Sequence, residues 1–143
     1  MARIIPNPKA STPAQVAANM KAMTRGMARA TARATYEIGH EILNKAIPLT
    51  PMDTGDLRDS GYVSWKPGGR GAIEVEVGFG GAAARYALAV HEMSESNNFQ
   101  EPGTGPKYLE RPFDEIKPSL AREVADRVAG MMAKNSAPTR PDK

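Results

Sequence analysis

The clearest pattern in the chain is a series of apolar or small residues that recur every three or four positions from residue 16. Its members are Val16, Met20, Met23, Met27, Ala30, Ala34 and Ile38. Alternating steps of four and three place such side chains along one narrow stripe of an α-helix. Thr12 followed by Pro13 and then Gln15 is typical of a helix start, with Thr12 as the N-cap. The pattern therefore predicts a helix from residue 12 to about Ile47.

This helix is predicted to change character along its length. Near its end, Leu43 and Ile47 lie on the side away from the stripe, so the last turns are apolar on two sides and should enter the core. The first turns carry only the narrow Met/Ala stripe, and we expect them to project and pack on another subunit. The methionines of this stripe are ordinary gap-fillers in a core, but here they are candidate partner-binding residues. They are Met20, Met23 and Met27.

Two glycines interrupt the helical pattern, Gly26 and Gly39. Each weakens a helix by about 1 kcal/mol relative to alanine. In return, each permits a neighbouring element to approach the helix backbone closely.

Further periodicities predict a β-hairpin and a second long helix. Residues 62–65 and 72–79 alternate apolar and polar positions on either side of a Gly-rich turn, as expected for antiparallel strands with one wet face. Apolar residues then recur at helical spacing at Leu109, Phe113, Ile116, Leu120, Val124, Val128 and Met131. They predict a last helix from about residue 108 to 132, kinked or restarted at Pro118. Residues 86–90 are short and apolar, and their pattern does not decide between strand and helix.

Together these elements predict a single α+β domain over residues 12–134, in which a small antiparallel sheet is packed by a long N-terminal helix and a C-terminal helix. The length of 143 residues suits one domain with a modest core. Residues 1–11 and 135–143 are Pro-rich and lack periodicity. They are predicted to form an extended N-terminal arm and a polar C-terminal tail.

The stretch Thr50-Pro-Met-Asp-Thr-Gly-Asp-Leu-Arg-Asp-Ser60 joins the first helix to the hairpin. Prolines at both ends of Leu49-Thr50 prevent the helix from continuing. Asp53 or Thr54 can cap a short turn, and Gly55 supplies backbone freedom. Leu57 is the apolar anchor, which we expect to insert into the core. The remaining polar residues of interest are Arg58 and Ser60.

Asp53-Thr54-Gly55 is also the tripeptide of aspartic proteases, which raises an enzymatic alternative. That chemistry needs two carboxylates that share one proton, one from each subunit of a small dimeric enzyme. It also needs an apolar strand that leads into the aspartate, whereas Pro-Leu-Thr-Pro-Met precedes Asp53 here. A dimeric aspartic protease is therefore the least favoured interpretation of the function, behind the two that follow.

Little else in the composition suggests catalysis. The chain has two histidines and no cysteine, so no set of nucleophile, base and orienting group can be assembled. Neither His40 nor His91 occurs in a spacing typical of zinc ligands. We therefore predict a protein that is not an enzyme, with no catalytic residue, no cofactor and no metal site. No apolar run approaches the roughly 20 residues of a membrane span, so no membrane partner is expected.

Positive charge is concentrated in the first third of the chain. Residues 1–47 hold seven basic and two acidic residues, whereas residues 48–107 hold five basic and eight acidic ones. Four of the basic residues, Lys21, Arg25, Arg29 and Arg33, step by four along the side of the helix opposite the apolar stripe. Like charges at this spacing repel by a few tenths of a kcal/mol per pair. Either this basic ridge is only solvated, or an acidic partner lies along it.

A non-specific DNA-binding module that uses the basic ridge is the second interpretation. Basic side chains at every fourth position would mainly contact phosphates and would not read bases. The acidic partner could equally be a protein face. We therefore name Lys21, Arg25, Arg29 and Arg33 as candidate partner-binding residues.

The favoured interpretation comes from a resemblance to a known family. The motif Pro51-x-Asp53-Thr54-Gly55-x-Leu57-Arg58-x-Ser60 resembles the signature of tail-completion and minor tail proteins of long-tailed bacteriophages. Later motifs follow in the family's order: Tyr86-Ala87, His91-Glu92, the loop Gly103 to Pro106, and Tyr108 to Phe113. The stretch from Met93 to Glu101 is longer and more polar than the family's compact loop.

The resemblance implies a structural component of the phage neck or tail top. Such a protein forms a homo-oligomeric ring that joins the DNA-filled head to the tail, and its neighbours are portal-side and tail-terminator proteins. Packaged DNA is a further candidate partner. The expected location is the virion, with the host cytoplasm during assembly, and the motif residues are expected to be structural.

Overall fold

The computed structural model describes residues 12–51, 55–81, 84–93 and 103–136. In chain order the elements are α1 (Pro13–Leu49), α2 (Asp56–Asp59), β1 (Gly61–Pro67), the 3-10 helix η1 (Gly69–Gly71), β2 (Ile73–Phe79), α3 (Ala84–His91), α4 (Glu110–Ile116), the 3-10 helix η3 (Lys117–Ser119) and α5 (Leu120–Ser136). The predicted α+β class is confirmed. The predicted N-terminal arm and most of the predicted C-terminal tail lie outside the described residues.

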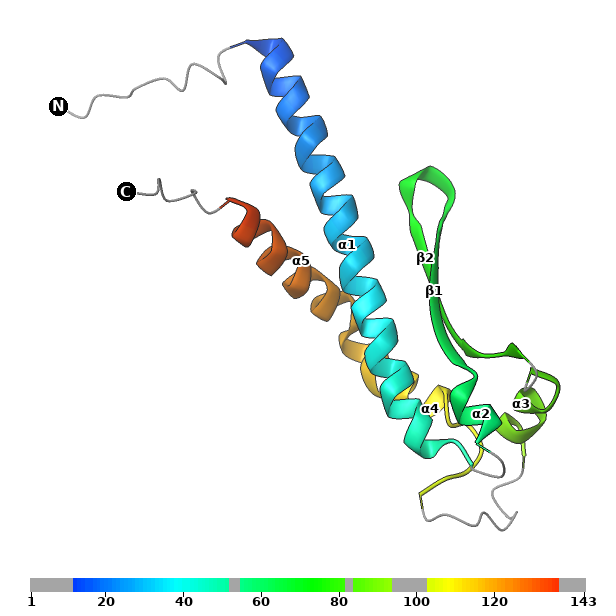
Figure 1. Ribbon diagram of the computed structural model, residues 1–143. Helices are drawn as coiled ribbons and strands as arrows, with labels where there is room; N and C mark the ends of the chain where they lie inside the picture. The colour runs from blue at the N-terminus through cyan, green and yellow to red at the C-terminus, as the bar shows by residue number, and fades with distance from the viewer. Residues whose placement is uncertain (1–11, 52–54, 82–83, 94–102, 137–143) are drawn as a thin grey trace, which may run out of the picture.

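Helix α1 forms the long axis of the molecule; α2, α3 and α4 gather at its C-terminal end, and the hairpin and α5 run alongside it (Figure 1). The predicted start is confirmed, since the Thr12 hydroxyl accepts a hydrogen bond from the Gln15 backbone N–H at 3.3 Å. The helix runs two residues beyond the predicted end and closes at the fully buried Thr50. The Thr50 hydroxyl donates to the Ala46 carbonyl at 2.8 Å, which satisfies that group.

The two strands form an antiparallel hairpin whose register pairs Val63 with Val77 and Trp65 with Val75. The valines of this face are half-buried and lie against α1 around Gly39. The outer face carries Ser64, Lys66, Glu74 and Glu76, which are all exposed. This is the predicted arrangement of one apolar and one wet face.

The C-terminal segment is broken at Pro118, as predicted, into α4 and α5 with η3 between them. Helix α5 packs along α1 (Figure 1), where the Arg127 guanidinium binds the Glu41 carboxylate at 2.7 Å. One core cluster lies between these helices and the hairpin and is built on Ile38, Ile42 and Ile116.

A second core cluster lies at the corner and holds α2 and α3 in place. It contains Leu57, Ala87 and Tyr108. The Tyr108 hydroxyl donates to the Ala87 carbonyl at 2.8 Å. Residues 86–90, whose pattern fits a strand or a helix, lie in helix α3. The hydrogen bond from Tyr108 attaches this helix to the core.

Candidate functional site

The corner between α1 and the hairpin is a structural joint. Gly55 caps α2 with φ of 90°, a left-handed conformation that favours glycine. Leu57 is buried against Ala87 and Tyr108, which confirms its predicted role as the apolar anchor. Asp53 and Thr54, the two predicted capping residues, lie outside the described residues.

The polar residues of the same motif tie the corner to its neighbours. Arg58 Nε donates to the Thr50 carbonyl at 2.9 Å, so the guanidinium caps the end of α1. The Ser60 hydroxyl donates to the Leu57 carbonyl at 2.7 Å, and the Ser60 carbonyl accepts from Gly80 N–H at 3.1 Å. Pro51 is half-buried beside them. The described motif residues thus bind one another and the backbone of the hairpin.

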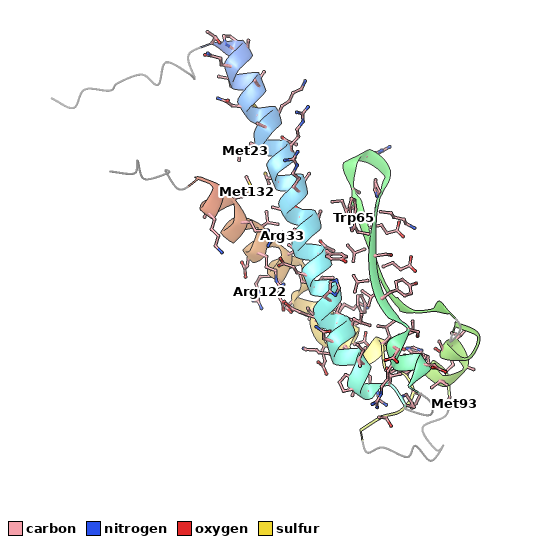
Figure 2. The ribbon with its side chains drawn as sticks, in the orientation of Figure 1. Met23, Arg33, Trp65, Met93, Arg122 and Met132 are labelled. Carbon is pink, nitrogen blue, oxygen red and sulfur yellow. The ribbon has the colours of Figure 1, made fainter. Side chains whose placement is uncertain are left out.

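The projecting half of α1 presents an exposed apolar stripe, of which Figure 2 labels Met23. The exposed members are Val16, Met20, Met23 and Met27, with Met20 and Met23 exposed by 65% and 61%. Further along the same stripe, Ala30 and Ala34 are buried. The stripe is therefore divided into a half that belongs to the core of this chain and a half that lacks a cover within the described residues. We refer to Val16, Met20, Met23 and Met27 as the exposed seam.

The basic ridge is also divided. Lys21, Arg25 and Arg29 are exposed and have no ion-pair partner among the described residues, whereas Arg33 binds Glu37 at 3.0 Å. Figure 2 places Arg33 at the level where α1 and α5 meet. The Arg33–Glu37 pair is solvent-exposed and contributes little to stability.

Arg29 and Arg33 lie beside a groove between α1 and α5 with a volume of about 520 Å³. Two more basic side chains, Arg127 and Lys134, reach this groove from α5. Sequence reasoning missed both, because α5 is far from α1 along the chain and only packing brings them together. Glu37 lines the same groove, and Arg127 is paired with Glu37, Glu41 and Glu123, so this groove carries charges of both signs.

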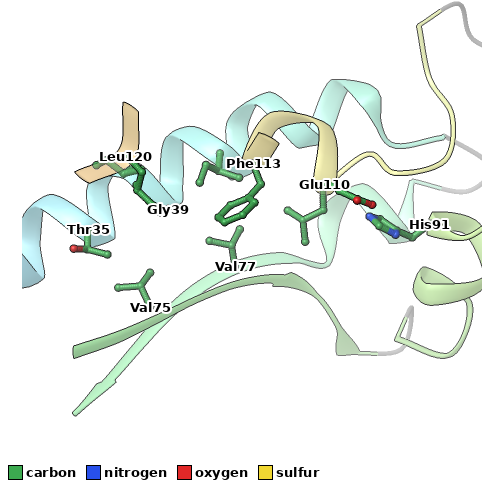
Figure 3. A pocket seen from close by; sticks show the side chains of 11 residues that line it. Thr35, Gly39, Val75, Val77, His91, Glu110, Phe113 and Leu120 are labelled. Carbon is green, nitrogen blue, oxygen red and sulfur yellow. The ribbon is translucent and has the colours of Figure 1, made fainter. Parts of the chain in front are cut away.

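An apolar groove of about 510 Å³ lies between α1, the inner face of β2 and the start of the C-terminal helices (Figure 3). Its walls include Gly39, Val75, Val77, Phe113 and Leu120. Phe113, predicted from its spacing to lie on the buried face of the last helix, is 41% exposed at this groove. Apolar side chains in an open groove are characteristic of a binding surface.

The polar groups of this groove lie at its edges. The Thr35 hydroxyl donates to the Thr31 carbonyl at 2.8 Å, so its hydrogen atom is already bonded within α1. His91 and Glu110 lie together at the opposite end (Figure 3). The middle of the groove therefore offers only apolar contacts.

A small charged cluster connects α3 to the start of α4. Lys107 Nζ binds the Glu92 carboxylate at 2.7 Å and that of Glu110 at 3.3 Å. Glu92 accepts a hydrogen bond from Lys107 and a second one from His91, and these hold the pKa of its carboxyl below the ordinary value. The same contact with Glu92, together with that to Glu110, raises the pKa of Lys107. These groups lie at the surface and fasten two segments together.

The two histidines are packed against tyrosines. His40 lies edge-on to Tyr36 with ring centroids 4.6 Å apart, and His91 lies edge-on to Tyr108 at 5.1 Å. Among the described residues, no group of three or more acidic or histidine side chains could hold a metal ion. None of the described helices combines the length and the apolar character needed to cross a membrane.

Comparison with known proteins gives a family for this architecture. Residues 14–88, just over half of the chain, match the HK97-gp10-like family, described as "Bacteriophage HK97-gp10, putative tail-component". No curated protein and no solved structure matches the chain. The matched segment covers α1, the corner motif, the hairpin and the beginning of α3. The later motifs, from His91-Glu92 to Phe113, lie beyond it. The chain therefore belongs to the HK97-gp10-like family of bacteriophage tail components.

Proposed function

We propose that this tail component acts in the phage neck or tail top, where it forms a homo-oligomeric ring that joins the DNA-filled head to the tail. The observation that carries the proposal is the exposed seam of α1. Four apolar side chains on a helix that projects from its own core are unfavourable in water. Contact with another chain would remove them from solvent.

The division of α1 into a packed half and a projecting half supports a ring. The C-terminal half of α1, the hairpin and the helices α3 to α5 form a packed body, so the projecting half of α1 is free to reach a neighbour. A surface that contacts a different surface on the next copy makes a head-to-tail interface, which closes into a ring when the rotation allows it.

We further propose that the basic ridge contacts an acidic face of a neighbouring portal-side or tail-terminator protein. Lys21, Arg25 and Arg29 repel one another without a partner. A protein face is favoured over packaged DNA because the exposed seam, on the other side of the same helix, already requires contact with another protein chain. Non-specific DNA binding is the competing function and predicts an affinity that falls steeply with salt.

Two measurements test the proposed function. Phage particles that lack this chain should accumulate filled heads and tails that are not joined, visible by electron microscopy. Averaged images of the purified protein or of the neck should show a closed ring that contains it. Normal joining in the absence of the chain would refute the proposal, and so would a protein that stays monomeric in the particle.

A further inference from the structure

We propose that the groove between α1 and α5 binds an acidic segment of a neighbouring protein, which Arg29 of α1 and Lys134 of α5 hold from two sides. The inference rests on the proposed contact with an acidic protein face and deepens it. It names the groove in which that contact is made, and it adds α5 to a surface that the ridge assigns to α1 alone.

Positive charge in this groove is balanced at one end only. Toward the C-terminal end of α1, the Arg127 guanidinium is paired with three carboxylates, of which Glu41 is the nearest at 2.7 Å. At the other end Arg29 and Lys134 line opposite walls, both are exposed, and neither has an ion-pair partner among the described residues. Two cations that share a groove repel each other, and a carboxylate that enters between them removes this repulsion.

The floor of the groove leaves room for side chains from another protein. Gly26, Ala30 and Gly130 line it, and none of them has a side chain longer than one methyl group. A Cβ atom at Gly130 would meet nothing within 4 Å, and the volume of the groove is about 520 Å³. A glutamate or aspartate side chain can therefore rest its methylene groups on this floor and direct its carboxylate to Arg29 and Lys134.

The charge pattern favours an acidic protein segment over DNA. Duplex DNA carries one negative charge about every 1.7 Å along its axis. A DNA backbone that followed the groove would therefore bring phosphates to the end where Glu37 lies, and that carboxylate would repel them. A protein segment can present its carboxylates to the basic end alone.

The test uses an oligoglutamate peptide as the probe for carboxylates and a short DNA duplex as the probe for phosphates. Each labelled probe is titrated with the intact chain, and fluorescence anisotropy gives the affinity. Lys134→Gln removes one of the two cations. Gly130→Met fills the floor without a change of charge, and methionine is a better helix former than glycine, so the variant should fold, which thermal unfolding verifies.

The matched controls are Lys117→Gln and Ala125→Met, at exposed positions of η3 and α5 that do not line the groove. We expect both groove variants to lower the affinity for oligoglutamate several-fold relative to their controls. Equal affinities of groove and control variants would overturn the inference, and so would a wild-type chain that does not bind oligoglutamate. A duplex whose affinity depends on Lys134 and Gly130, when that of oligoglutamate does not, would assign the groove to DNA and overturn it as well.

Combining substitutions tests whether the two helices act on one ligand. If Arg29 and Lys134 hold the same acidic segment, the loss of affinity in Arg29→Gln, Lys134→Gln should differ from the product of the two single losses. The combination of Arg29→Gln with Lys117→Gln should give the product. Independent effects of Arg29 and Lys134 would contradict a shared ligand.

The same variants in phage particles separate this inference from the proposed function. Gly130→Met, Lys134→Gln should reduce head–tail joining several-fold, whereas Ala125→Met, Lys117→Gln should not. Joining that requires the chain but is normal with the groove variant would overturn this inference and leave the proposed function standing. Joining that is normal without the chain would overturn both.

Discussion

Gly39 of α1 lies directly against Val63 of β1, because a Cβ atom at Gly39 would be only 3.0 Å from Val63 Cγ1. The same Cβ would be 3.1 Å from Val75 Cγ1 and 3.3 Å from Val77 Cγ2. The hairpin therefore packs on the helix backbone itself. The close neighbour that the glycine pattern predicted is, at this position, a strand pair of the same chain.

The first prediction concerns this contact. Gly39→Leu should lower the free energy of unfolding by about 1–3 kcal/mol, because three valines leave no room for a side chain and the hairpin must move away. Chemical denaturation monitored by circular dichroism measures this change.

The matched control is the other glycine of α1. A Cβ at Gly26 would meet Met132 Cε at 3.7 Å, an ordinary contact distance. Gly26→Ala should therefore raise the free energy of unfolding by up to about 1 kcal/mol through helix propensity alone. Gly39→Ala should gain less than Gly26→Ala, and an equal gain would show that the hairpin yields easily.

The second prediction concerns the corner motif. Gly55 has φ of 90°, and a Cβ there would meet nothing within 4 Å. Gly55→Ala should therefore destabilise the protein by about 1–2 kcal/mol through backbone strain and not through a clash. Gly69 is equally open but lacks a positive φ, so Gly69→Ala should change the stability much less. Similar effects of the two substitutions, measured by thermal unfolding, would contradict the strain argument.

Local signals in the sequence were sufficient for the ends of several elements. Thr12 and Pro13 act within one turn, so the start of α1 could be read directly from the residues. Pro118 breaks the last helix for an equally local reason, since it lacks a backbone donor. The corner could also be predicted, because Gly55 and Leu57 combine a special backbone conformation with a single apolar anchor.

Other features depend on contacts between distant residues. The pattern of residues 86–90 fits a strand or a helix equally well. These residues form a helix, and its Ala87 carbonyl accepts a hydrogen bond from Tyr108, which is far away in the sequence. Trp65 belongs by its alternation to the inner face of the hairpin, yet it is 59% exposed because it lies toward the tip of the hairpin, away from the core clusters (Figure 2). The approach of Arg127 and Lys134 to the basic ridge follows from the packing of α5 on α1, which no local pattern encodes.

The third prediction concerns the charged cluster of Glu92 and Lys107. Glu92 has a pKa below its ordinary value of 4.5 in the folded protein, so its ion pair stabilises fully above that value and is lost as the pH falls through the folded pKa. Lys107 has a pKa above its ordinary value of 10.5, so its contribution is complete below that value and is lost as the pH rises further. The difference in stability between wild type and Lys107→Met should therefore be constant across the neutral range.

That difference should shrink at both extremes of pH, and the pKa of the Glu92 carboxyl should rise in the variant. Carboxyl titration by NMR and unfolding at several pH values measure the two effects. The control is Lys117→Met, since Lys117 is exposed and has no ion-pair partner in the described part of the chain. A Glu92 pKa that is the same in Lys107→Met as in wild type would show that another group sets it.

The last prediction concerns the basic ridge. The double variant Arg25→Glu, Arg29→Glu should fold normally, because both side chains are exposed and neither has an ion-pair partner among the described residues. It should nevertheless fail to support head–tail joining, because it reverses the charge offered to an acidic partner. Particle assembly and infectivity measure the effect.

The control for the ridge reverses the same number of charges elsewhere. Lys117→Glu, Arg122→Glu changes two exposed basic residues of η3 and α5, so it has the same net charge as the ridge variant. If a protein face is the partner, a charge-reversed partner should restore joining to the ridge variant, and binding should depend only weakly on salt. If DNA is the partner, no protein variant should rescue it, and the affinity of the wild-type chain should fall steeply with salt, because binding to phosphates releases counterions from the DNA. Normal joining by the ridge variant would show that Lys21, Arg25 and Arg29 form only a solvated face.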